Sequence, residues 1–362
     1  AALGVDPGRN QVLSVGGQDF RKQGDWSDET WVSTGGDDFV SIKKGGDLTM
    51  ARYTTPVHMG DSLLAVNHST FEVSKATQTG WETAIAQMPE QRRRENYERF
   101  DDRMVNFGAS PVAVFMLDAQ GAVWRAQPGG PWQQVAGPGE GPDSRYSRRV
   151  AMSFDPTSRR LVVFGGLENN DTWVHDTQSW RKLQDSIRPR AGIASMAATP
   201  GGLYLLAGTD LWVLADDAWR CVGSDDSIRA RGLLYDRPND ALFTFDSEHP
   251  ASRMYTWTAN GWRQVATLPE GLRVRDTMSG TGTEAGLDSE NGVFHLLHED
   301  MSYTLDLGRL DLSDAIRPTG DATPMAATTE APVEHLANTL TVETSGEFVP
   351  VDQLGIDVVV PE

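Results

Sequence analysis

Tryptophan recurs along this chain at a nearly constant interval, and this repeat limits the possible folds more than any other feature. One series consists of Trp124, Trp173, Trp212 and Trp257, and a second consists of Trp132, Trp180, Trp219 and Trp262. An independent marker, in which Arg follows Ile or Leu, recurs at 186–190, 227–231, 271–275 and 315–319. Two markers with a shared period of ~44 residues indicate a chain of repeated units.

The unit at 149–183 shows what one repeat contains. Apolar residues alternate over 150–154, and an apolar run over 161–164 stops at Gly165-Gly166. Trp173 and Trp180 lie in two further short segments. Four short strands with turn residues between them are typical of a four-stranded antiparallel sheet. With this period, such sheets are expected to be the blades of a β-propeller.

About seven units can be laid out along the chain. They cover 1–47, 52–86, 102–137, 149–183, 190–223, 231–266 and 275–313. In this layout the seventh unit supplies its own fourth strand, over 309–313. The sequence therefore predicts an all-β fold, a single β-propeller of about seven four-stranded antiparallel blades at 1–316, with a C-terminal extension.

The C-terminal extension has a different composition. Residues 317–333 are rich in Ala, Thr and Pro and are predicted to be a linker. Residues 334–362 are predicted to be a tail with one or two strands, at 338–344 and 353–360. These strands are expected to pack on the edge of the propeller, to complete a blade or to bind another chain.

The repeated unit resembles the kelch repeat. The resemblance rests on Val163-Phe164-Gly165-Gly166, Asp171-Thr172-Trp173 and Trp180, and on a second copy at Gly16-Gly17 and Thr30-Trp31. It implies a propeller fold and carries little information about function. The glycine pair is expected to let the chain leave the second strand. The tryptophans are expected to fill the space between neighbouring sheets.

Composition excludes several functional classes. A net charge of −19 argues against binding to nucleic acid or to anionic membranes. The single cysteine, Cys221, excludes an internal disulfide and a cysteine-based zinc site. The sequence has no run of 18 apolar residues, so no insertion into a membrane is expected.

The candidate binding site is formed by arginines that recur in the connections between successive blades. In a propeller these connections and the loops between second and third strands lie on one face, near the mouth of the central channel. Arginines that converge there would bind carboxylates through paired, charge-assisted hydrogen bonds. The predicted binding residues are Arg52, Arg145, Arg190, Arg231 and Arg275 from the connections, with Trp26 and Arg253 from long loops at 18–29 and 246–253.

A structural role for the same arginines is the alternative interpretation. One arginine at a fixed place in each repeat can pair with an acidic residue of the neighbouring blade, and the chain contains 51 Asp and Glu residues. The first arginine of each pair, as in Arg188, Arg229 and Arg273, is the better candidate for such a contact. The second arginine is the better candidate for ligand binding.

Evidence for catalysis or metal binding is weak in the sequence. His295 and His298 lie three residues apart on a predicted strand and so point to opposite faces. The kelch-like oxidases of the galactose oxidase type use a Cys cross-linked to a Tyr, whereas Cys221 follows Trp219 in a packing position. No phosphate-binding glycine loop and no nucleophile motif is present. We therefore expect neither a metal nor a cofactor.

Two functions of different class follow from the sequence. The first is a non-enzymatic interaction module that binds an acidic or carboxylate-bearing protein segment on its arginine-lined face, as part of a larger complex. The second is a propeller enzyme, similar to the kelch-like mutarotases, that acts on a small anionic sugar through a carboxylate beside those arginines. A deep pocket with one desolvated carboxylate would favour the enzyme.

Overall fold

The structure is a computed structural model of the chain. It describes residues 2–6, 11–19, 25–33, 39–42, 54–59, 62–67, 70–77, 80–85, 88, 106–118, 122–137, 140–142, 150–165, 170–176, 179–183, 189, 194–246, 252–268, 274, 284–288, 291–298, 301–318 and 349–350. In this part of the chain, no helix is both long enough and apolar enough to cross a membrane.

The described residues form seven four-stranded sheets, each with its strands in chain order. The first two sheets consist of β1 (Ala2–Asp6), β2 (Gln11–Asp19), β3 (Asp25–Ser33) and β4 (Phe39–Ile42), and of β5 (Thr54–Met59), β6 (Ser62–Asn67), β7 (Val73–Thr77) and β8 (Gly80–Ile85). The third and fourth consist of β9 (Asn106–Ser110), β10 (Ala113–Leu117), β11 (Val123–Ala126) and β12 (Gln133–Ala136), and of β13 (Val150–Asp155), β14 (Arg160–Gly165), β15 (Thr172–His175) and β16 (Trp180–Lys182).

The remaining sheets follow the same plan. The fifth and sixth consist of β17 (Ala194–Thr199), β18 (Gly202–Ala207), β19 (Asp210–Ala215) and β20 (Ala218–Ser224), and of β21 (Ala230–Asp236), β22 (Ala241–Asp246), β23 (Arg253–Thr258) and β24 (Gly261–Thr267). The seventh consists of β25 (Glu284–Asp288), β26 (Val293–His298), β27 (Met301–Asp306) and β28 (Val349–Pro350). Neighbouring strands are antiparallel throughout these pairings.

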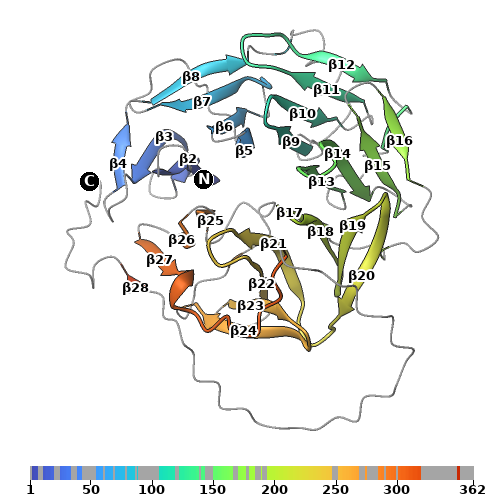
Figure 1. Ribbon diagram of the computed structural model, residues 1–362. Coiled ribbons are helices and arrows are strands. Elements are labelled where there is room, and N and C mark those ends of the chain that lie inside the picture. Colours follow the sequence, from blue (N-terminus) through green and yellow to red (C-terminus); the bar gives the residue numbers. More distant parts are fainter. Residues whose placement is uncertain are drawn as a thin grey trace.

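The sheets are arranged as a closed ring (Figure 1). The first strand of each sheet contacts the first strand of the next sheet, from β1 through β5, β9, β13, β17 and β21 to β25. β25 in turn contacts β1, which closes the ring. The fold is a β-propeller, as the sequence predicted.

Six of the blades are complete and come from continuous segments, whereas the seventh sheet differs from the prediction. The predicted fourth strand over 309–313 is wrong. β27 leads instead into a 3-10 helix, η4 (Leu307–Arg309), where the Asp306 carboxylate accepts the N–H of Gly308. The fourth position is taken by β28, which pairs with Tyr303 and Thr304. The tail strands predicted at 338–344 and 353–360 lie outside the described residues.

The hydrophobic core lies between the blades, because alternate residues of each second strand face opposite neighbours. In β18, Leu203 and Leu205 pack with the fourth sheet, whereas Tyr204 and Leu206 pack with the sixth. All four are buried. A continuous apolar strand therefore indicates burial on both faces, as the middle strands of a ring of sheets require.

The paired tryptophans have the structural role that the sequence predicted. Trp212 and Trp219 belong to the cluster between the fourth and fifth sheets, and Trp257 and Trp262 belong to the cluster between the fifth and sixth. Each pair packs against the preceding sheet. The Trp219 indole also donates to Thr172 Oγ1 across this interface, at 2.6 Å. The tryptophan period is therefore the period of inter-blade packing.

The glycine pair of the repeat has different roles in the fourth and the first sheets. Gly165 ends β14 with φ of 100°, a conformation that favours glycine, and its N–H donates to the carbonyl of Asp171. In the first sheet, by contrast, β2 continues through Gly16-Gly17 to Asp19, with an irregular register between Val15 and Gly17. The long loop predicted at 18–29 is therefore mostly strand, because β3 begins at Asp25.

Candidate functional site

The propeller has two chemically different faces, defined here by the connections that reach them. The hairpin face carries the turns between first and second strands and between third and fourth strands. The junction face carries the second-to-third connections and the connections between sheets. The arginine motifs were predicted for the junction face.

The connection between the fifth and sixth sheets is described in full, and it shows how the motif at 227–231 is held. The Asp225 carboxylate accepts the N–H of Ser227 at 2.9 Å and the N–H of Trp262 at 2.7 Å. Ile228 is buried in the cluster between these two sheets. Arg229, the next residue, is exposed. An anchored aspartate and a buried isoleucine thus fix the backbone beside Arg229.

Arg231 follows at the junction end of β21. Its backbone pairs with Phe245, and the register of β21 shifts between Arg231 and Leu234. Gly232 has φ of 72° at this bulge, and its carbonyl accepts the Thr244 hydroxyl at 2.6 Å. The bulge explains why glycine follows the second arginine here.

Arg253 lies at the same end of the same sheet. It begins β23 and pairs with Asp246 on one side and with Thr267 on the other. The Arg253 side chain is half-buried, and its guanidinium group acts on the Tyr255 hydroxyl. Burial raises the pKa of Tyr255 and the arginine opposes this rise, so Tyr255 stays a neutral partner at physiological pH.

The structure describes three of the seven predicted binding residues, and the other four lie outside the described part of the chain. The sixth sheet brings the backbones of Arg231 and Arg253 to one end. Trp26 lies in β3, where it pairs with Gln18 in the extended part of the hairpin. Arg52, Arg145, Arg190 and Arg275 lie outside the described residues.

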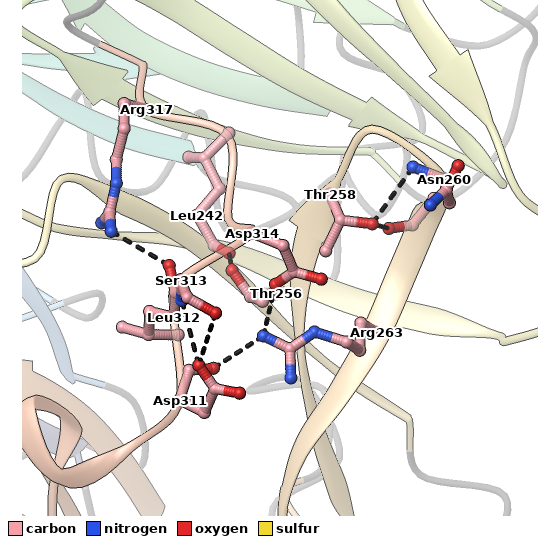
Figure 2. Close-up of polar contacts among 11 residues, drawn as sticks. Leu242, Thr256, Thr258, Asn260, Arg263, Asp311, Leu312, Ser313, Asp314 and Arg317 are labelled. Atoms are coloured by element: carbon pink, nitrogen blue, oxygen red, sulfur yellow. Dashed lines mark hydrogen bonds and ion pairs between the residues drawn. The ribbon is translucent and has the colours of Figure 1, made fainter. Parts of the chain in front are cut away.

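The fourth copy of the marker, at 315–319, lies at the opposite face. It belongs to a segment of residues 307–318, called here the strap, which runs from β27 back along the sixth sheet (Figure 2). Ala315 bridges to Thr258, and the N–H of Ile316 donates to the carbonyl of Trp257. Arg317 donates to the carbonyls of Asn239 and Leu312. At this copy the arginine is a structural contact.

Ion pairs also hold the strap and the neighbouring hairpins. Arg263 of β24 pairs with Asp314 at 2.5 Å and donates to the carbonyl of Asp311 (Figure 2). Between the fourth and fifth sheets, Asp217 pairs with Arg160 at 2.5 Å and with Arg181 at 2.6 Å. These contacts lie near the hairpin face, so inter-blade arginine pairing exists in this protein away from the predicted site.

Among the described residues, the carboxyl group with the most clearly raised pKa lies at the hairpin face. Asp236 ends β21 and is fully buried. Burial raises the pKa of Asp236 to about 6, the Asn239 amide opposes this rise, and the charges of Asp288 and Asp306 add to it. An ideal Cβ on Gly292, in the seventh sheet, would lie 3.3 Å from Asp236 Oδ1, so the carboxyl packs at the seam between the sixth and seventh sheets.

Asp236 should make the stability of the protein depend on pH. Because its pKa of about 6 in the folded protein exceeds the ordinary 3.8, the folded state holds the proton more tightly, and stability falls as pH rises from 4 to above 6. We expect Asp236→Asn to raise the free energy of unfolding at pH 8 by about 2–3 kcal/mol. Urea unfolding at pH 8 and pH 4 measures this difference. A gain of the same size at both pH values would contradict the assignment.

The junction also contains a repeated anchor that sequence reasoning missed. Just after each of four fourth strands, a backbone N–H donates to the carbonyl of a Thr or Ser near the start of the third strand: Met88 to Thr70, Leu183 to Thr172, Asp225 to Thr209 and Leu268 to Ser252. The recurrent Thr or Ser is the signal that would have revealed it. These bonds fix where each inter-blade connection begins.

No cluster of three or more His, Cys, Asp or Glu side chains suited to a metal occurs among the described residues. His295 is half-buried, and burial lowers its pKa to about 4. Its imidazole is therefore neutral at physiological pH. Cys221 is exposed on the outer strand β20, opposite Trp212, in place of the packing position expected from the sequence.

Comparison with known proteins supports the β-propeller fold and does not assign the chain to a family. No protein-family model matches the chain, and no curated protein matches it. Among solved structures, KlHsv2 with loop 6CD replaced by a Gly-Ser linker matches at a TM-score of 0.52 and 10% identity, over 87% of this chain and 94% of that one. The chain shares the β-propeller fold with that protein.

Two other solved structures match with lower TM-scores. YCF48 bound to D1 peptide matches at a TM-score of 0.48 and 14% identity, over 83% of this chain and 87% of that one. Saccharomyces cerevisiae Sqt1 matches at a TM-score of 0.46 and 12% identity, over 84% and 82%. At such identities, similarity concerns the fold and not the function.

Proposed function

We propose that this propeller is a non-enzymatic binding module whose junction face takes up an acidic segment of a protein partner. The observation that carries the proposal is the arrangement at the sixth sheet. There the exposed Arg229, the strand residue Arg231 and the loop-end residue Arg253 come from two different connections to one end of one sheet. We also propose that the repeat is of the kelch type, on its Gly-Gly and Asp-Thr-Trp residues.

The arrangement suits carboxylates for a physical reason. A guanidinium group presents its donors in a planar fork that matches a carboxylate, and it keeps its charge at all physiological pH values. Buried Ile228 and the bonds of Asp225 fix the backbone beneath Arg229, so less conformational entropy is lost on binding than in an unanchored loop. Arg188 and Arg190, from the first copy of the motif, lie outside the described residues, and their part in this surface stays a prediction.

The position of Asp236 argues against the enzyme alternative. An acid/base carboxylate would have to lie beside the arginines, whereas Asp236 lies at the hairpin end of β21. Arg231 and Asp236 are five residues apart on that strand, which corresponds to about 16 Å. The raised pKa of Asp236 is explained by burial at an inter-blade seam. It therefore gives no support for catalysis at the junction face.

A charge-reversal experiment tests the proposal. The affinity of a fluorescein-labelled decaglutamate peptide is measured by anisotropy for the wild type and for Arg229→Glu/Arg231→Glu. We expect the double variant to bind the peptide with an affinity at least about tenfold lower than that of the wild type, because two charge-assisted contacts are replaced by repulsion. Binding of the wild type should weaken as salt is raised.

The matched control is Arg220→Glu/Arg309→Glu. It changes the net charge by the same amount, but Arg220 pairs with Asp216 and Arg309 pairs with Asp306 towards the hairpin face. We expect this variant to keep wild-type affinity. Equal losses in both double variants would mean that the peptide responds to net charge, and the proposed face would then be wrong.

A further inference from the structure

We propose that the outer seam between the third and fourth sheets holds a binding site for a small organic acid, which it recognises by its carboxylate. Arg125 and Trp180 form the site from the two sides of the seam. The site is separate from the junction end of the sixth sheet, so it goes beyond the proposed function and does not depend on it.

Two cross-strand pairs bring four side chains together at this seam. Arg125 of β11 lies directly opposite Phe115 of β10. Trp180 of β16 lies directly opposite His175 of β15. Such pairs point to the same face of a sheet, with Cβ atoms about 4.5–5.5 Å apart. Across the seam, the ring centroids of Phe115 and His175 are 5.9 Å apart, so one connected row of side chains runs from Arg125 to Trp180.

Each end of this row carries a buried N–H group that has no hydrogen-bond partner among the described residues. These groups are Arg125 Nε and Trp180 Nε1. At the equivalent position of two other units, Trp132 and Trp219 donate to the preceding sheet, at 2.7 and 2.6 Å. A buried donor without an acceptor is costly, so two such donors at one seam favour a ligand that supplies acceptors.

The two donors lie where a ligand can reach them, because the side chains of Arg125 and Trp180 are half-buried. Trp212 and Trp262 also have an indole N–H without a partner in the described part of the chain, but both residues are buried. An ideal Cβ on Gly141 would lie 3.3 Å from Trp180 Cδ1 and 3.6 Å from Nε1. The glycine therefore leaves room beside the indole N–H.

The charge of the seam suits an anion. Within the described residues, Arg125 takes part in no ion pair. The nearby Asp176 carboxylate accepts the N–H of Ser179 at 3.1 Å in its own turn. Burial lowers the pKa of His175, the charge of Asp176 opposes this, and the charge of Arg125 adds to it, so the imidazole is neutral at physiological pH. Arg125 thus supplies the positive charge of the site.

The surroundings of the two donors favour an acid with an apolar body. Trp173 and Trp180 are both half-buried and pack against the cluster between the third and fourth sheets. Their rings offer apolar surface beside the polar groups. A carboxylate can accept from the guanidinium and the indole at once, whereas a neutral amide forms no charge-assisted bond with the arginine. The ligand class is therefore an aromatic or aliphatic carboxylic acid.

Indole N–H NMR spectra of the isotope-labelled protein test this site. The Trp180 resonance is assigned by its loss in Trp180→Phe, and phenylacetate is titrated at constant ionic strength. We expect the Trp180 indole proton to shift downfield until the site is saturated, because the carboxylate accepts its hydrogen bond. In Arg125→Gln, the affinity for phenylacetate should be at least about tenfold lower than in the wild type.

Arg181→Gln is the matched control for charge. Arg181 follows Trp180 in β16, but it pairs with Asp217 of the fifth sheet, so this variant should keep wild-type affinity. Uncharged phenylacetamide should leave the Trp180 resonance in place. No saturable shift with phenylacetate, an equal shift with phenylacetamide, or equal losses in the two arginine variants would each overturn the site. The wild-type titrations with the two compounds decide this even if Arg125→Gln does not fold.

A last comparison keeps this site distinct from the junction face. Arg229→Glu/Arg231→Glu should bind phenylacetate as the wild type does, although we expect it to lose decaglutamate. A loss of phenylacetate affinity in that variant would place the acid at the junction face, and the seam site would then be wrong.

Discussion

Replacement of Trp219 by alanine is expected to lower the free energy of unfolding by about 3–5 kcal/mol. The side chain is 2% exposed and packs edge-to-face against Phe164 of the preceding sheet, with ring centroids 6.2 Å apart. The substitution removes this packing and leaves the Thr172 hydroxyl without its indole donor. Because the indole joins two sheets, the loss acts on the ring and not on one blade alone.

Two further variants separate packing from hydrogen bonding. Trp219→Phe keeps most of the apolar contact and loses the indole N–H, so a loss of about 1–2 kcal/mol is expected. Trp180→Ala removes a tryptophan at the equivalent position that is only half-buried, and its loss should be smaller than that of Trp219→Ala. Urea unfolding measures all three. A loss below 1 kcal/mol for Trp219→Ala would contradict the inter-blade role.

Shortening the chain should reveal a sharp boundary at the strap. A chain that ends at Pro318 is expected to fold, whereas one that ends at Asp306 is expected to lose its cooperative unfolding transition. The strap buries Leu307, Leu310, Leu312 and Ala315 in the cluster between the sixth and seventh sheets. Burial of three leucines alone is worth about 5–9 kcal/mol, which is comparable to the whole stability of a domain.

Thermal unfolding followed by circular dichroism distinguishes the two shortened chains. The predicted domain limit of 1–316 requires that the longer one melts as a single cooperative unit. Similar melting of both chains would show that the strap is dispensable. Failure of both to fold would show that the propeller needs residues beyond 318, and the predicted limit would be wrong.

The repeat pattern predicted the fold because each of its signals reports local burial. A continuous apolar run such as 202–207 specifies a strand buried on both faces, and the tryptophan period specifies the contact between blades. The prediction of the fourth strand of the seventh sheet failed for a related reason. Leu310 and Leu312 alternate as in a strand and are buried, yet they belong to the strap. Alternation shows that a segment is extended and packed, and does not show which partner it packs against.

The candidate site was predicted less completely, because a short motif does not determine the face on which it lies. Ile228 and Ile316 precede arginines in two copies of the same marker. After Ile228, a connection between sheets carries Arg229 to the junction face, whereas Arg317 is tied to Asn239 in a hairpin. The difference arises from the path of the chain after β27, which depends on contacts with the sixth sheet that are distant in sequence.

Hydrogen–deuterium exchange of the protein with and without the decaglutamate peptide tests most directly which face binds acidic segments. We predict slower exchange on peptide binding in fragments that cover 225–231 and 252–255, at the junction end of the sixth sheet. Exchange in the hairpins at 199–202, 216–218 and 236–240 should stay unchanged. Protection confined to these hairpins, or no protection at the junction while the peptide is bound, would contradict the account.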